Sequence, residues 1–119
     1  MSATANCFLI AAAIASGENS TGEIDLEGFT ALAIQTPSAW TTANLTFTAT
    51  EVTGGTHQDV YDDAGAEVTV TASASKVIGI GDTVMKKLRA LRFVKIRSGT
   101  TGSPVNQGGP RTLNLILKK

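Results

Sequence analysis

The chain has 119 residues, of which 42% are apolar and only 17% charged, and its formal net charge is zero. This length fits a single domain with its own hydrophobic core, and the composition excludes a disordered chain, which would combine low hydrophobicity with high net charge. The single cysteine, Cys7, excludes an intrachain disulfide, so cysteine usage does not indicate an oxidising compartment. We therefore expect one domain over residues 1–119.

The charged side chains are sorted along the chain. Residues 1–75 hold nine of the ten acidic side chains and no Lys or Arg, whereas residues 76–119 hold all ten basic side chains and only Asp82. The two parts carry formal charges of −9 and +9. Such a split is neutralised either within one subunit, by pairing early strands with late ones, or between copies, and the sequence leaves both open. Both alternatives favour an interaction protein over an enzyme.

The first candidate element is the apolar run Cys7–Ala15. It is far shorter than the ~20 residues that span a bilayer, and no basic segment precedes it as in a signal peptide, so we expect neither a membrane partner nor export. Its alanines suit a helix, but Phe8, Ile10, Ala12 and Ile14 also alternate as in a strand. We favour the strand, with residues 1–15 forming an N-terminal arm or an edge strand.

Period-two alternation of apolar and polar residues predicts further strands. Phe29–Thr36 is apolar on both faces and therefore reads as a central strand. Leu91–Ser98 changes its apolar parity between Phe93 and Val94, which indicates a bulge or a passage between sheets. The complete set of runs is Glu23–Leu26, Phe29–Thr36, Asn44–Glu51, Glu67–Thr71, Leu91–Ser98 and Thr112–Lys118.

Asp82–Leu91 is the one helical candidate, because Val84, Leu88 and Leu91 recur at helical spacing and Asp82 fits an N-cap. A loop across the end of the domain is the alternative. Turn signals separate the strand candidates at intervals of roughly 8–12 residues. The pattern predicts an all-β fold, an antiparallel jelly-roll-like β-sandwich of seven or eight strands.

No set of residues predicts catalysis, a metal or a cofactor. His57 is the only histidine, and no local signature joins it to Cys7 or to a serine; we expect Cys7 to be a buried, inert thiol. The acidic residues between Asp59 and Glu67 lack the spacing of a calcium loop and fit turn chemistry. The glycines form neither of the common phosphate-binding motifs. We therefore predict that the chain is not an enzyme.

Two features suggest contacts with other proteins. The first is a basic segment, in which aromatic residues are too scarce for binding single-stranded nucleic acid. This segment is either an exposed face whose cations pair with nearby carboxylates, without a function, or an interface with another protein. The second is Trp40, which fits a core or an interface better than a sugar-stacking platform with Tyr61. The predicted interface residues are Lys86, Lys87, Arg89, Arg92, Lys95, Arg97 and Trp40.

Three segments together resemble a group of small structural proteins of tailed bacteriophages. They are Phe29–Thr50 with its T-P-x-x-W-T and L-T-F-x-A patterns, Asp59–Val70 with a Y-D-x-x-G hairpin, and Leu91–Gly99 with L-R-F-V-K-I-R-S-G. The resemblance covers most of residues 24–117, and its ordering is more distinctive than any single piece. It implies a β-sandwich or jelly-roll module of the virion and carries over no catalytic residue.

The resemblance implies capsid decoration, or cement, as the first role. The partners would be the major capsid protein and further copies of the chain, with a homotrimer favoured, and the protein would be made in the host cytoplasm and end in the virion. The alternative is a carbohydrate-binding module of a tail, collar or fibre that uses Trp40, Tyr61 and His57. The sequence leaves open the host, the copy number, the lattice site and the choice between head and tail.

Overall fold

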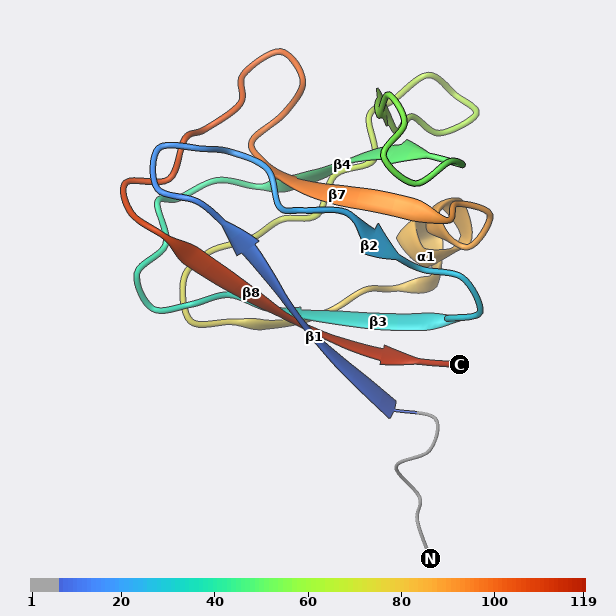
Figure 1. The fold of residues 1–119 in the computed structure, drawn as a ribbon, viewed down its shortest axis with the longest axis horizontal. Helices are drawn as coiled ribbons and strands as arrows, with labels where there is room; N and C mark the ends of the chain where they lie inside the picture. The colour runs from blue at the N-terminus through green and yellow to red at the C-terminus, as the bar shows by residue number, and fades with distance from the viewer. Residues whose placement is uncertain (1–6) are drawn as a thin grey trace, which may run out of the picture.

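The computed structural model describes residues 7–119 and forms two four-stranded antiparallel sheets (Figure 1). The first six residues of the predicted N-terminal arm lie outside the described part. The elements in chain order are β1 (Cys7–Ile14), β2 (Ile24–Asp25), β3 (Ala31–Gln35), β4 (Leu45–Thr50), β5 (Gln58–Asp59), β6 (Val77–Gly79), α1 (Asp82–Leu88), β7 (Phe93–Ser98) and β8 (Arg111–Lys118).

The strand order identifies a jelly roll. One sheet has the order β1-β8-β3-β6 and the other β2-β7-β4-β5. The first strand thus pairs with the last, the second with the seventh, the third with the sixth, and the fourth with the fifth. This is one long antiparallel ribbon wound between two sheets, the arrangement of eight-stranded jelly rolls. The predicted all-β sandwich is confirmed.

The core lies between the two sheets and comes from alternate residues of the strands. Leu113, Leu115 and Leu117 of β8 are buried, as the alternation predicted, and they face Phe47 and Ile96 of the other sheet's strands. β-branched and leucine side chains on a pleated surface supply this core without help from a disulfide. The opposite alternate positions of each strand form the two outer faces of the sandwich.

The apolar run at the start of the described chain is β1, an edge strand paired with β8 over its whole length. Strand therefore prevailed over helix, because β8 offers a complete antiparallel partner. Unlike the strands of the core, β1 exposes side chains on its outward face: Leu9 is 77% exposed, and Cys7 is only partly buried. The expectation of a fully buried thiol was wrong, since Cys7 lies at the open end of an edge strand.

Three strand predictions need correction. The predicted strand Glu67–Thr71 is absent: Glu67 and Val70 form only isolated bridges, to Tyr61 and Leu45, because this segment crosses the end of β4 instead of pairing along a neighbour. β3 is central in its sheet, but only Leu32 and Ile34 are buried, so one of its two apolar faces is an outer face. β7 pairs with β4 without interruption, so β7 itself has no bulge. The extra residue lies in the opposing segment, where Ser20 bridges Arg97 while Ile24 pairs with Val94. The change of parity in the sequence has another cause: Phe93 is a half-buried apolar residue on the outward side of β7, beneath the Arg92 guanidinium, whereas Val94 and Ile96 lie in the core.

The predicted helix is α1, which ends at Leu88 rather than Leu91 and buries Met85 and Leu88. Its N-cap is Gly81, which makes no side-chain capping hydrogen bond, and Asp82 is the first helical residue. Asp82 was therefore misassigned as the cap by one position. A carboxylate in the first turn still interacts favourably with the helix dipole. Over the described part of the chain, none of the helical structure is long and apolar enough for a membrane span.

Candidate functional site: two unlike outer faces

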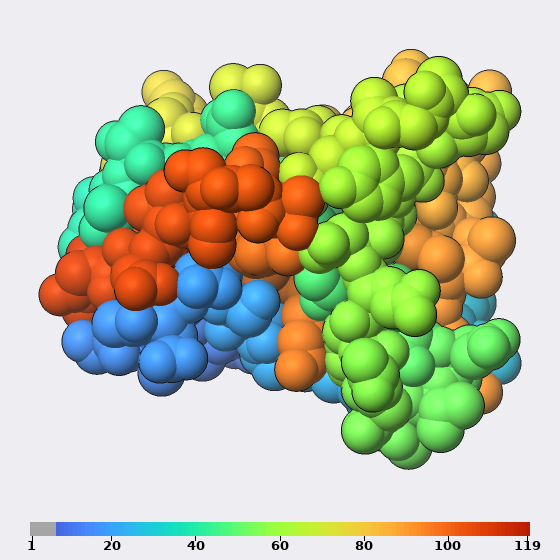
Figure 2. All heavy atoms as spheres, turned by 90° about the horizontal axis from the view of Figure 1, so that it is seen from above, coloured from blue at the N-terminus to red at the C-terminus, as the bar shows by residue number. Residues whose placement is uncertain are grey.

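The outer face of the β2-β7-β4-β5 sheet carries a buried arginine cluster. Arg97 donates to Asp59 over 2.7 Å through Nη1, to Glu67 over 2.5 Å through Nη2, and to the Thr46 hydroxyl over 3.0 Å through Nε. Thr101 donates its hydroxyl to Asp59 and its backbone N–H to Glu67. The cluster joins β7 to β5, to the segment after β5 and to the loop after β7, and the loops around residues 60–70 and 100–106 cover this side of the molecule (Figure 2).

Hydrogen bonds hold the pKa values of two carboxyls in these loops below their usual range. For Asp59 the cause is chiefly the Arg97 guanidinium and then the Thr101 hydroxyl. For Asp62 the cause is chiefly the backbone N–H of Ala66, followed by that of Ala64. Both carboxyls therefore have lower pKa values in the folded chain than in the unfolded chain, and the stability of the fold depends on pH through them.

Part of the sorted charge is neutralised within the subunit. Arg97 pairs with Asp59 and Glu67, and each of these pairs joins the basic part of the chain to the acidic part. The remaining ion pairs of residues 7–119 that involve Lys or Arg are Lys87 with Asp62, Arg92 with Asp25 and Glu27, and the local pair of Arg89 with Asp82. The jelly roll explains this pattern, since it pairs early strands with late ones.

The predicted interface residues are not brought together on one open surface. Trp40 is buried and donates Nε1–H to the Ala43 carbonyl, and Arg97 is buried in its cluster, so neither side chain is available to a partner. This corrects the prediction for those two residues. Lys87, Arg89 and Arg92 are engaged in ion pairs. Lys86 and Lys95 form no ion pair within residues 7–119 and remain as candidate contacts.

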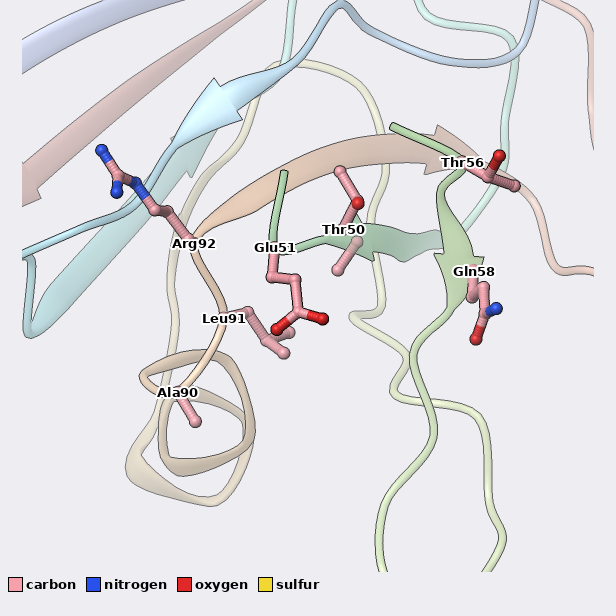
Figure 3. Close-up of a pocket in the computed structure, with 8 residues that line it drawn as sticks. Thr50, Glu51, Thr56, Gln58, Ala90, Leu91 and Arg92 are labelled. Carbon is pink, nitrogen blue, oxygen red and sulfur yellow. The ribbon is translucent and has the colours of Figure 1, made fainter. Parts of the chain in front are cut away.

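A hollow of about 360 Å³ lies between the end of β4, β5 and the turn after α1 (Figure 3). Glu51 extends toward Leu91 across it, while the guanidinium of Arg92 points away from it. The other polar lining residues are threonines and Gln58. Acid–base or nucleophilic catalysis needs a second reactive group within hydrogen-bond reach of the first. The hollow offers one carboxylate, and it supports no catalytic assignment.

The other sequence candidates are also separated by the fold. His57 is nearly buried, with Nε2 lying 3.2 Å from Glu23 but not aligned for a hydrogen bond. Tyr61 is about half exposed, but His57 and Trp40 are buried, so these residues form no common sugar-stacking platform. In residues 7–119, no group of three or more His, Cys, Asp or Glu side chains lies close enough to hold a metal ion.

The outer face of the β1-β8-β3-β6 sheet is almost uncharged. The register aligns one row of Leu9, Ile116, Ala33 and Gly79 across the four strands. The next row is Ala11, Asn114, Gln35 and Val77, and Lys118 is the only charged residue among the outward positions of these strands. Leu9 is 77% exposed and Val77 63%. The sequence signal for this face was the double-sided apolar pattern of Phe29–Thr36, which we had read as central burial.

No family model matches this chain, and searches of curated proteins and of solved structures also found no match.

Proposed function

We propose that this chain is a structural protein that acts by docking on other proteins, and that it decorates the capsid of a tailed bacteriophage. The observation that carries the docking role is the outer face of the β1-β8-β3-β6 sheet. Soluble domains seldom expose a contiguous apolar patch unless another surface covers it. The finer assignment to a virion is supported by the sequence resemblance, and jelly rolls occur in viral capsid domains, although a fold does not determine a function.

The docking surface in this proposal differs from the basic segment that the sequence suggested. Most cations of that segment are already paired within the subunit. A nearly uncharged sheet face fits an apolar patch on a shell, and many weak contacts on a lattice add to a stable coat. The major capsid protein is the proposed partner, and further copies of the chain are proposed as neighbours.

Cosedimentation with capsid shells tests this function. The shells are assembled from the major capsid protein of a tailed phage whose genome encodes this chain, and the purified protein is added at increasing concentration. We expect saturable binding. The variant Gln35→Lys, which adds a charge in the middle of the proposed face, should weaken binding about tenfold or more because that charge must be desolvated.

Lys86→Gln is the matched control, since it changes one charge on the exposed side of α1, away from the proposed face. We expect it to bind as the unmodified protein does. Equal binding by Gln35→Lys together with weak binding by Lys86→Gln would move the contact back to the basic segment. A failure of the unmodified protein to bind shells at any concentration would refute the decoration role.

A further inference from the structure

The free edge of β1 is the second unusual surface of the molecule. β1 ends the β1-β8-β3-β6 sheet, and among residues 7–119 its outer edge meets the chain only through the bridge of Ile14 to Thr21. The backbone from Cys7 to Ala13 is therefore unpaired on that side within the described chain. Proteins usually protect such an edge with Lys, Pro, a bulge or a very short strand. β1 has eight residues and none of these devices.

A groove of about 320 Å³ runs beside this edge, between Ile10–Ala13 of β1 and Gly22–Ile24. It is the side opening of the sandwich, where the two sheets separate. A strand added to β1 would place every second side chain over this opening. Those side chains need to be apolar, because the groove is lined by residues such as Ile10, Ala12 and Ile24.

We infer that a second copy of this chain occupies the edge, with the two β1 strands paired antiparallel about a two-fold axis. β1 has the pattern that the groove requires, since Phe8, Ile10 and Ala12 alternate on its core side. An axis at Ile10 overlaps the whole free segment, Cys7–Ala13. It also sets large residues against small ones, Phe8 against Ala12 and Leu9 against Ala11.

The side chains also favour a copy of the same strand over a charged partner. No residue from Cys7 to Ala15 is charged, so two β1 strands meet without like-charge repulsion. Pairing would hydrogen-bond the unpaired edge of both strands and cover the exposed parts of Phe8 and Leu9. It would also join the two uncharged outer faces into one continuous surface. The interface is isologous, as in most two-fold dimers.

This inference deepens the proposed function, on which it rests, by naming one partner of the assembly. A two-fold pair also differs from the trimer that the sequence resemblance favoured. Head-to-tail pairing of β1 with β6, the other edge of the same sheet, would give rings or filaments instead. β6 has only three residues, which makes it the poorer partner for an eight-residue strand.

Sedimentation equilibrium of the full chain and two variants tests the pairing. Ala11→Lys places a charge on the exposed side of β1 at the proposed interface, and Val77→Lys places the same charge on β6 at the opposite edge. We expect a monomer–dimer equilibrium for the unmodified chain, a dissociation constant raised about tenfold or more by Ala11→Lys, and no change for Val77→Lys. Circular dichroism establishes that each variant is folded.

Three outcomes overturn the pairing: a monomer at all concentrations, a trimer, or an equal loss of association in both variants, which indicates face-to-face or head-to-tail contact.

Hydrogen exchange on the unmodified chain gives a second test that needs no variant. We expect the amides of Cys7–Ala13 that point away from β8 to become protected as concentration rises, and unchanged exchange in a dimer would also overturn the inference. A monomer that still binds shells refutes the pairing alone, whereas a dimer that ignores shells refutes the decoration role alone.

Discussion

At the scale of single residues, the surroundings of Arg97 explain how a charged side chain can be buried in this fold. Each of its three guanidinium nitrogens donates one hydrogen bond, two of them to carboxylates and one to a threonine hydroxyl. Removal of one partner from such a cluster leaves charges partly buried and unpaired, which costs more than the cluster contributes as a whole. The cluster therefore specifies the positions of the loops around β7.

Arg97→Ala should lower the free energy of unfolding by about 2–4 kcal/mol, because Asp59 and Glu67 then lose their common partner. Arg92→Ala is the matched control. Its pairs with Asp25 and Glu27 are on the surface, where such pairs contribute about 1 kcal/mol or less. Urea denaturation of both variants measures the difference. A smaller loss for Arg97→Ala than for Arg92→Ala would contradict the role of the cluster.

The carboxyls with lowered pKa values predict loss of stability in acid. Asp59, Asp62 and Glu23 have folded-state pKa values below their ordinary values of 3.8, 3.8 and 4.5. A depressed pKa stabilises the fold above the unfolded-state value, and this contribution disappears as the pH falls through the folded-state value. We expect the urea midpoint to fall as the pH drops below about 4.5, and to fall less in Asp59→Asn. An unchanged midpoint between neutral pH and strong acid would contradict this.

Glycine shows its conformational freedom at Gly99, immediately after β7. Its φ of +91° is a left-handed conformation, and a Cβ atom there would lie 2.5 Å from the Ser103 carbonyl oxygen. The turn that brings Thr101 to the arginine cluster therefore requires a residue without a side chain. This single position couples the end of a core strand to the loop that covers the outer face.

At the scale of elements, α1 and β1 are the two that depart most from ideal design. α1 begins at Asp82, and its N-cap residue, Gly81, has no side chain, so the first backbone N–H groups lack a side-chain acceptor. β1 presents a long unprotected edge. The missing cap lowers the stability of the helix, and a capping side chain would restore it. The unprotected edge of β1 is a site where a further strand can pair.

Gly81→Ser should raise the free energy of unfolding by about 0.5–1 kcal/mol. Serine supplies an N-cap acceptor and reduces the freedom of the unfolded chain, and the site has φ of −72° with no atom near the new Cβ. Gly54→Ser is the control, because φ there is +73° and the same substitution should destabilise. Thermal melts compare the two, and stabilisation by both or by neither would contradict the capping argument.

At the scale of the whole molecule, the two outer faces of the jelly roll have opposite characters. One carries the arginine cluster and is covered by loops (Figure 2), whereas the outward positions of the other sheet's strands include a single charged residue, Lys118. Part of the charge split along the sequence is thus paired within each subunit, where the ion pairs hold loops in place. In the proposed assembly, association rests on apolar contacts and backbone pairing.

This division predicts how association responds to salt. Contacts between charged surfaces weaken as ionic strength rises, whereas apolar contacts do not and are strengthened by excluded salts such as sulfate. We expect dimerisation, followed by sedimentation, to change little between low and high sodium chloride and to strengthen in sodium sulfate. A steep loss of dimer in sodium chloride would indicate that the sorted charges act between subunits after all.

The sequence by itself determined the all-β class, most strand positions and the one helix, because alternation and turn residues act over a few neighbours in the chain. The apolar residues on both faces of Phe29–Thr36 also indicated the uncharged outer face of β3. Only the tertiary structure decided that Lys87, Arg92 and Arg97 pair with early carboxylates, that Arg97 and Trp40 are buried, and that β1 is an open edge. These properties depend on which distant strands become neighbours, and side-chain alternation within one strand does not specify its partner.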